Sequence, residues 1–192
     1  MKLQERLPNH IKVGKRNVRV NLDFRNVLNM IDILAQKDLM PEAREWLALK
    51  CICRHPVKGM MPVVRKMLFA GAKENNEDRI TDFVQDADLI RAAFLQEYGI
   101  NLFREKLHWF EFSCLLSCIP EGSKYSSILS IRAKPMPEPN KYNEKERVWL
   151  ANAKAEFALK LTEEEQQKKY NSDVKRLGDF LIALAGEGEK NV

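Results

Sequence analysis

The apolar residues of this chain alternate with polar ones in one short stretch, residues 11–22, and recur at helical spacing in the segments that follow. Within that stretch, IKV and VRVNL are separated by the turn sequence Gly14-Lys15-Arg16-Asn17, a pattern typical of a β-hairpin. Two strands alone are marginally stable in water, so the apolar face of the hairpin needs another surface to cover it. The pattern therefore predicts a hairpin packed on helices.

Six helices are expected after the hairpin. Asn21 or Asp23 is a suitable N-cap for the first helix, and Gly99 is a suitable C-cap for the fourth. In the second helix, Trp46, Leu47 and Leu49 are expected on the buried face. The apolar spacing places the helices at residues 23–36, 41–54, 60–72, 81–98, 103–119 and 123–131. The predicted fold class is mainly α: an N-terminal β-hairpin packed on a bundle of about six helices, with a C-terminal helical arm.

A proline-rich segment divides the chain. Residues 134–143, KPMPEPNKYN, carry three prolines in five positions, which is typical of a linker. The predicted domains are therefore a hairpin and helical-bundle core over residues 1–133, this linker, and a charged amphipathic helical arm over residues 144–192.

The arm helix, over about residues 144–169, has an apolar line on one face, and a terminal helix near 173–185 continues it. Two interpretations are open. The line packs on the bundle of its own chain, or it docks on another chain as an amphipathic helix in a groove. In the second case the expected partner-binding residues of the arm are Trp149, Phe157, Leu161 and Phe180.

The excess of positive charge lies at the N-terminus. The formal net charge is +5, and residues 1–25 hold seven Lys or Arg and two acids, so that seven minus two accounts for all of it. Arg16 and Arg19 lie in the turn and second strand of the hairpin. A basic patch suits nucleic acid or an acidic protein surface. A solvated hairpin face has the same composition, and the small size of the patch favours that interpretation.

One run, LHWFEFSCLLSCIPEG at residues 107–122, is rich in reactive residue types. Cys114 and Cys118 share a helix face, but His108 lies about 120° around the helix from Cys114. Zinc usually needs four protein ligands, or three and a water. The thiols fall on one line with two apolar side chains: Leu107, Phe110, Cys114 and Cys118. The run therefore predicts a central core helix in which the cysteines act as small hydrophobes, in preference to a metal site.

Signatures of an enzyme are missing from the sequence. It contains no HExxH, no GxGxxG or phosphate loop, and no GxSxG elbow. Asp82, Asp86 and Asp88 suggest a metal site at first sight, but acids are expected in the first turn of a helix because of its dipole. We therefore expect no enzyme activity, no cofactor and no metal, and assign no catalytic, cofactor-binding or metal-binding residue.

The expected compartment is a cytoplasm. No run approaches the roughly 20 apolar residues that a bilayer requires, and the N-terminus lacks the apolar core of a signal peptide. Four cysteines suit a reducing environment, where they stay as thiols: Cys51, Cys53, Cys114 and Cys118.

Two blocks of sequence resemble a known family. The first contains LP at 7 and 8, IKV, a glycine turn, VRV and LDFRNVL at 22–28. The second contains DADLIRAAFLQEYGINL at 86–102, then LHWFEF and IPEGSKYSSILSIR at 119–132. In this order and spacing, residues 5–132 resemble the bacteriophage gene-product-fifteen family, small proteins encoded near the tape-measure gene of long-tailed phages. The resemblance does not cover the arm.

The resemblance implies a non-enzymatic role in phage tail morphogenesis, similar to that of tail assembly chaperones. The expected partners are the tape-measure protein or a partner chaperone, with self-association open and no membrane. Arg16 and Arg19 are expected to steer acidic partners. The expected location is the host cytoplasm during assembly, and retention in the virion tail is open. The alternative function is a small nucleic-acid-binding regulator that uses the basic hairpin. This alternative is disfavoured because the hairpin has no exposed aromatic residue on which bases could stack.

Overall fold

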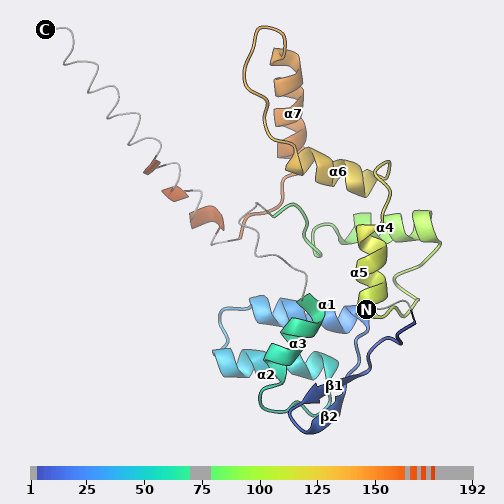
Figure 1. Ribbon diagram of the computed structural model, residues 1–192. Coiled ribbons are helices and arrows are strands. Elements are labelled where there is room, and N and C mark those ends of the chain that lie inside the picture. Colours follow the sequence, from blue (N-terminus) through green and yellow to red (C-terminus); the bar gives the residue numbers. More distant parts are fainter. Residues whose placement is uncertain (1–3, 70–78, 163–164, 168–169, 172–173, 176–192) are drawn as a thin grey trace, which may run out of the picture.

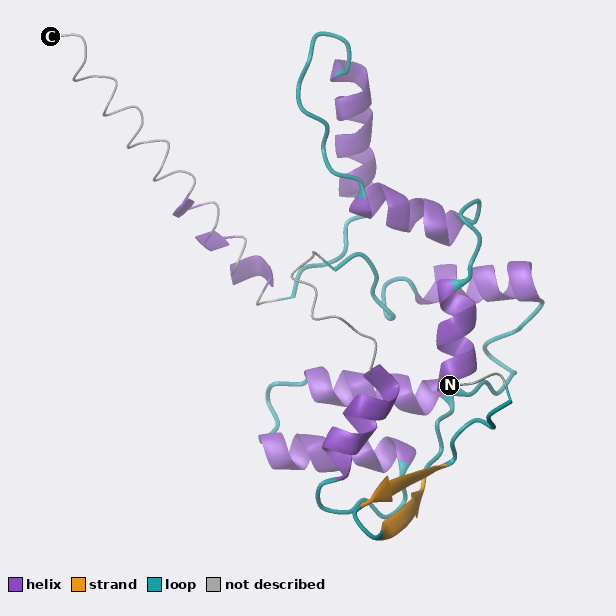
Figure 2. Cartoon of the chain, in the orientation of Figure 1, coloured by secondary structure: helices purple, strands orange, loops and turns teal. Residues whose placement is uncertain are grey.

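The computed structural model describes all residues except 1–3, 70–78, 163–164, 168–169, 172–173 and 176–192. The protein is mainly helical, with one two-stranded antiparallel hairpin near its N-terminus (Figures 1 and 2), which confirms the predicted fold class. The strands are β1 (His10–Val13) and β2 (Arg16–Arg19). The helices are α1 (Phe24–Ala35), α2 (Pro41–Ile52), α3 (Met60–Phe69), α4 (Ala87–Tyr98), α5 (Trp109–Ser117), α6 (Lys124–Ala133) and α7 (Glu144–Glu156).

The hairpin closes through a two-residue turn. Val13 pairs with Arg16, and Gly14 has a positive φ of 59°, a conformation that glycine adopts without steric cost. Ile11 and Val20 are buried in the main hydrophobic core, and β1 packs against α3. The predicted cover for the apolar face of the hairpin is therefore supplied by helices.

The helices form a chain of neighbours. In Figure 1, α1, α2 and α3 lie together beside the hairpin, and α5 joins this group to α4. Helix α6 packs on α4, and α7 packs on α6, so that α7 and the hairpin lie at opposite ends of the molecule. No helix in the described part of the chain is long and apolar enough to cross a membrane.

Aromatic rings fill the junction of α1, α4 and α5. The ring of Phe112 stacks on Phe24, with centroids 4.7 Å apart, and on Phe94, with centroids 5.2 Å apart. Trp109 lies 5.9 Å from Phe112 on the same helix. Only 1% of Phe112 is exposed, so it is the centre of this part of the core.

Helix α5 is shorter than predicted and buries one face. His108 caps it: the Phe110 N–H donates to His108 Nδ1 at 3.3 Å, and the His108 N–H donates to Glu111. Trp109 and Phe112 are buried, but Cys114 and Cys118 are exposed. The prediction of core cysteines was wrong, because α1 and α4 pack on one side of the helix and leave the cysteine side uncovered.

Helices α2 and α4 also differ from the sequence pattern. Helix α2 turns Ala48, Leu49 and Ile52 inward, which confirms the predicted burial of Leu49. The predicted burial of Trp46 and Leu47 was wrong, and 52% of Trp46 is exposed. Helix α4 begins at Ala87, about one and a half turns after the predicted start. Residues 83–86 form a separate turn, because the Asp82 carboxylate accepts the N–H groups of Val84 and Gln85.

Residues 134–143 form a loop that returns the chain from α6 to α7, so that the two helices pack together (Figure 1). Leu150 of α7 is fully buried and Ile128 of α6 is buried, and neither belongs to the main core cluster. Lys134 binds Glu146 at 2.9 Å across this pair. Helix α7 ends at Glu156, before the predicted end near residue 169. The division of the chain into three domains remains a prediction.

Candidate partner-binding groove

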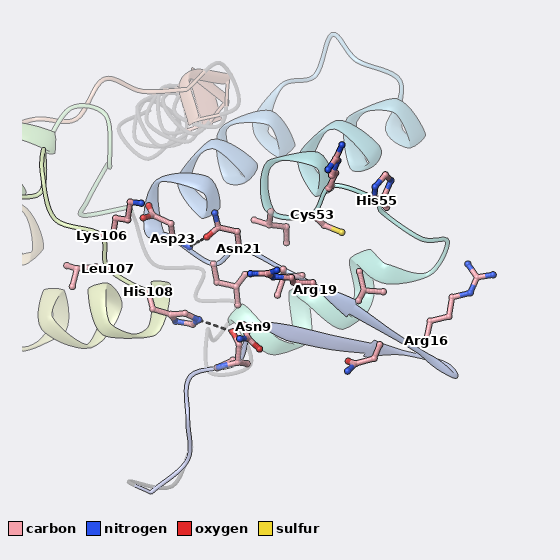
Figure 3. A pocket seen from close by; sticks show the side chains of 17 residues that line it. Asn9, Arg16, Arg19, Asn21, Asp23, Cys53, His55, Lys106, Leu107 and His108 are labelled. Carbon is pink, nitrogen blue, oxygen red and sulfur yellow. Dashed lines mark hydrogen bonds between the residues drawn. The ribbon is translucent and has the colours of Figure 1, made fainter.

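A groove of about 1150 Å³ runs along the hairpin (Figure 3). One wall is β2 and the segment that follows it, residues 16–23. The other wall is the end of α2 and the loop after it, residues 52–55, and residues 106–108 lie at one end. Three segments that are far apart in the sequence therefore form one recess.

The free edge of β2 faces this groove. Antiparallel pairing alternates the backbone groups of a strand between its two edges, and the Val20 N–H donates to Asn9 on the β1 side at 2.9 Å. The groups of Asn17, Arg19 and Asn21 therefore point away from β1. The Asn21 N–H confirms this direction, since it donates to the Ile52 carbonyl at 2.7 Å across the groove. No backbone hydrogen bond in the described residues joins residues 16–19 to any segment but β1.

The end of the groove near α5 is rigidly built. The Phe24 N–H donates to the Leu107 carbonyl at 3.0 Å, and the Trp109 N–H donates to Leu22 at 2.7 Å. His108 Nε2 lies 3.0 Å from the Pro8 carbonyl, so Nε2 carries the hydrogen and Nδ1 is free to accept from Phe110. These bonds tie the N-terminal segment, the start of α1 and the start of α5 together, and give His108 a structural role.

The groove is basic. Four exposed cationic side chains line it: Arg16, Arg19, Arg54 and Lys106. The lining includes one carboxylate, Asp23, so four minus one gives a net charge of +3 with neutral histidines. The Asp23 carboxylate is already engaged, because it accepts the Arg25 N–H at 3.0 Å as the cap of α1. In the described part of the chain, none of the four cations makes an ion pair.

The structure brings together two of the predicted partner-binding residues, Arg16 and Arg19, and adds Arg54 and Lys106, which the sequence analysis missed. The only sequence signal for these two is their positive charge, and many exposed lysines and arginines share it.

The predicted arm residues lie elsewhere. Trp149 is 57% exposed on α7, Phe157 is half-buried at the end of α7, and Leu161 is exposed beyond it. Phe180 lies outside the described residues.

A buried ion pair fixes the part of the molecule that carries α7. Arg132, in the last turn of α6, binds both oxygens of the Asp86 carboxylate at 2.8 Å. Arg132 also donates to the carbonyls of Ile80 at 3.0 Å and Phe157 at 2.6 Å. Asp86, at the N-terminal end of α4, is 1% exposed, and accepts the Asp82 N–H at 2.9 Å. The pair therefore connects α4, α6 and the end of α7.

The Asp86–Arg132 pair makes stability depend on pH. Although burial alone raises the pKa of the Asp86 carboxyl, hydrogen bonds from Arg132 and the Asp82 N–H hold it below its ordinary value. The unfolded chain therefore takes up a proton at Asp86 before the folded chain does. We expect the unfolding free energy to fall as pH decreases below about 4, through the lowered pKa of Asp86. Urea unfolding at a series of pH values measures how the unfolding free energy depends on pH.

The matched variant for this acid effect is Asp86→Asn. It is less stable than the parent protein at neutral pH, and its unfolding free energy falls less steeply below about pH 4, because the titrating group is absent. Parallel curves for the two proteins would contradict the assignment to Asp86.

The described residues offer no metal site: no group of three or more His, Cys, Asp or Glu side chains among them could hold an ion. Asp88 is not part of an acidic cluster, because its carboxylate points to solvent and binds Arg91 at 2.9 Å. Asp82 and Asp86 instead bind Arg79 and Arg132.

The fold and the groove define a small, mainly helical protein whose N-terminal hairpin presents a basic strand edge. The family described as Bacteriophage Gp15 protein matches residues 3–159 of this chain. The chain therefore belongs to the Bacteriophage Gp15 protein family, and membership indicates a phage structural or morphogenesis protein.

The match confirms the resemblance and extends it. It runs beyond residue 132, through the loop after α6 and the whole of α7, so the matched range includes Trp149 and Phe157. Leu161 and Phe180 lie outside the matched range. No curated protein and no solved structure matches the chain.

Proposed function

We propose that this protein is a non-enzymatic tail assembly factor, similar to a chaperone, that binds the tape-measure protein or a partner chaperone in the host cytoplasm. Family membership supports a morphogenesis role. The observation that carries the proposal of binding is the exposed apolar surface on α7, a helix that belongs to the matched range.

Helix α7 has two unlike faces. Leu150 is fully buried against the rest of the chain, whereas its neighbours Val148 and Trp149 are more than half exposed. Most of the other residues of this helix are charged or small, EKERVWLANAKAE. A large exposed aromatic side chain on a charged helix is typical of a surface that a partner covers, because tryptophan is enriched among the residues that dominate interface energetics.

A tape-measure chain is long and helical, so its apolar residues need temporary cover before the tail tube polymerises around it. Covering apolar surface stabilises a complex by about 25 cal/mol per Å². The charged residues around Trp149 keep the free protein from aggregating through the same surface. These features suit a transient binder.

We expect Trp149→Ala to weaken binding to the tape-measure protein about tenfold or more, because truncation removes the largest exposed apolar side chain of α7. The measurement is co-expression with the tape-measure protein of the same phage, followed by co-purification and titration calorimetry. Asn152→Ala, at another exposed position of α7, is the matched control and should bind normally. If the parent protein never co-purifies with the tape-measure protein or a tail chaperone, and tails assemble without it, the proposed function is wrong.

A further inference from the structure

In the described part of the chain, the outer edge of β2 makes no backbone hydrogen bond at residues 16–19. Asn17 and Arg19 direct their backbone N–H and C=O groups from β2 toward the groove, as does Asn21. The bond from Asn21 to Ile52, at 2.7 Å, closes one end of this edge and leaves residues 16–19 open. An open edge of this kind is a template for another extended segment.

Proteins usually protect such an edge by making it short or by placing charges on it. Here the edge is short, and the charges form the walls of a groove on both sides of it. Arg16 and Arg19 come from the strand itself, Arg54 comes from the opposite wall, and Lys106 comes from the end near α5. Figure 3 shows Arg16 near the turn of the hairpin and Lys106 at the far end, with Arg19 between them. The cations therefore follow the direction of the edge.

We propose that this groove binds an acidic, extended segment of a partner protein, which adds to β2 as a third strand. Backbone hydrogen bonds to Asn17 and Arg19 provide the pairing, and carboxylates of the segment meet the four exposed cations. The proposal rests on the proposed function, since the segment is taken to belong to a tail assembly partner. It adds the chemistry of that partner and a second contact surface, at the end of the molecule opposite to α7.

The lining favours a peptide over a nucleic acid. Among the described residues of the groove there is no Phe, Tyr or Trp, so bases have no aromatic ring on which to stack. A strand edge presents alternating donors and acceptors, which match a peptide backbone, whereas a phosphodiester backbone offers acceptors only.

The test uses a fluorescein-labelled peptide of about eight alternating valines and glutamates, a length that spans the edge at roughly 3.3 Å per residue. We expect saturable binding to the full chain by fluorescence anisotropy, and no binding of the peptide with lysine in place of glutamate. Arg16→Glu/Arg19→Glu should weaken binding by about tenfold or more. Lys12→Glu is a single charge reversal that serves as a control, because Lys12 is the partner of Asn17 on β1 but lies outside the groove. It should bind within about twofold of the parent protein.

A second variant separates strand addition from simple charge attraction. Asn17→Pro removes an N–H that points away from β1, so the hairpin keeps its own pairing while the edge loses a donor and gains a steric block. We expect it to lose peptide binding with an unchanged circular dichroism spectrum. If it binds the peptide as tightly as the parent protein does, strand addition is wrong. Stronger binding of a single-stranded oligonucleotide than of the acidic peptide would also overturn the proposal.

The two proposals fail in different ways. If the groove proposal alone is wrong, the parent protein co-purifies with the tape-measure protein and the Arg16→Glu/Arg19→Glu variant does so equally well. If the proposed function alone is wrong, the peptide binds and responds to Asn17→Pro, but no tail protein co-purifies.

Discussion

Replacing Arg132 by methionine is expected to lower the unfolding free energy by about 3–5 kcal/mol, because it leaves the Asp86 carboxylate buried without its partner. The change removes two bonds to the carboxylate and two to the carbonyls of Ile80 and Phe157. Methionine fills a similar length of apolar space, so the loss measures mainly the uncompensated charge and carbonyls. Urea unfolding followed by circular dichroism provides the measurement.

Lys134→Met is the matched control for this prediction. Lys134 lies two residues further along the chain and forms an ion pair with Glu146 at 2.9 Å. Both side chains of this pair are about half exposed. Its loss should cost no more than about 1 kcal/mol. The double variant Asp86→Leu/Arg132→Met should be more stable than Arg132→Met alone, since it removes the buried charge as well. Equal losses for Arg132→Met and Lys134→Met would show that the pair is not desolvated.

Local patterns in the sequence predict the elements of this fold but not all of their contacts. The alternation in residues 11–22 predicts the hairpin, and the Asp23 cap and Gly99 stop appear in the structure as predicted. The Asp86–Arg132 pair could not be predicted, because its members lie 46 positions apart. In the sequence, neither residue differs from an ordinary charged residue of a helical segment. Long-range polar pairing leaves no periodic signal in a sequence.

The groove was predictable only in part, for a related reason. Arg16 and Arg19 stand out because they lie close together in a basic run of the sequence. Arg54 and Lys106 lie far along the chain from that run, and only the tertiary fold brings them to the same recess. A cluster assembled from distant segments needs tertiary structure to be recognised.

The two candidate surfaces lie at opposite ends of the molecule, and this arrangement has a consequence for partner binding. The groove beside the hairpin suits an extended acidic segment, and the exposed face of α7 suits an apolar helix (Figure 1). When one long partner is bound at one surface, its second segment is held at a high effective concentration near the other surface. The overall affinity then exceeds the affinity of either surface alone. If both proposals hold, one partner that carries an apolar helix and an acidic extended segment would occupy both surfaces at once.

Helix α5 shows how an element that is apolar nearly all round can mislead. Spacing alone does not say which of its faces meets the core, and the structure buries Trp109 and Phe112 while Cys114 stays exposed. We expect Phe112→Ala to lower the unfolding free energy by about 3–5 kcal/mol, since it opens a cavity between the rings of Phe24 and Phe94.

Cys114→Ala, two positions further along the same helix, is the matched control for Phe112→Ala. It removes an exposed thiol and introduces a better helix former, so the unfolding free energy should stay within about 0.5 kcal/mol of the parent value. Urea unfolding of both variants gives the comparison. If Cys114→Ala lowered the unfolding free energy nearly as much as Phe112→Ala does, the Cys114 thiol would be a core residue and α5 would be covered on both sides. The outcome expected from the structure instead leaves the cysteine face of α5 open to solvent, with the stability of the helix carried by the face that contains Phe112.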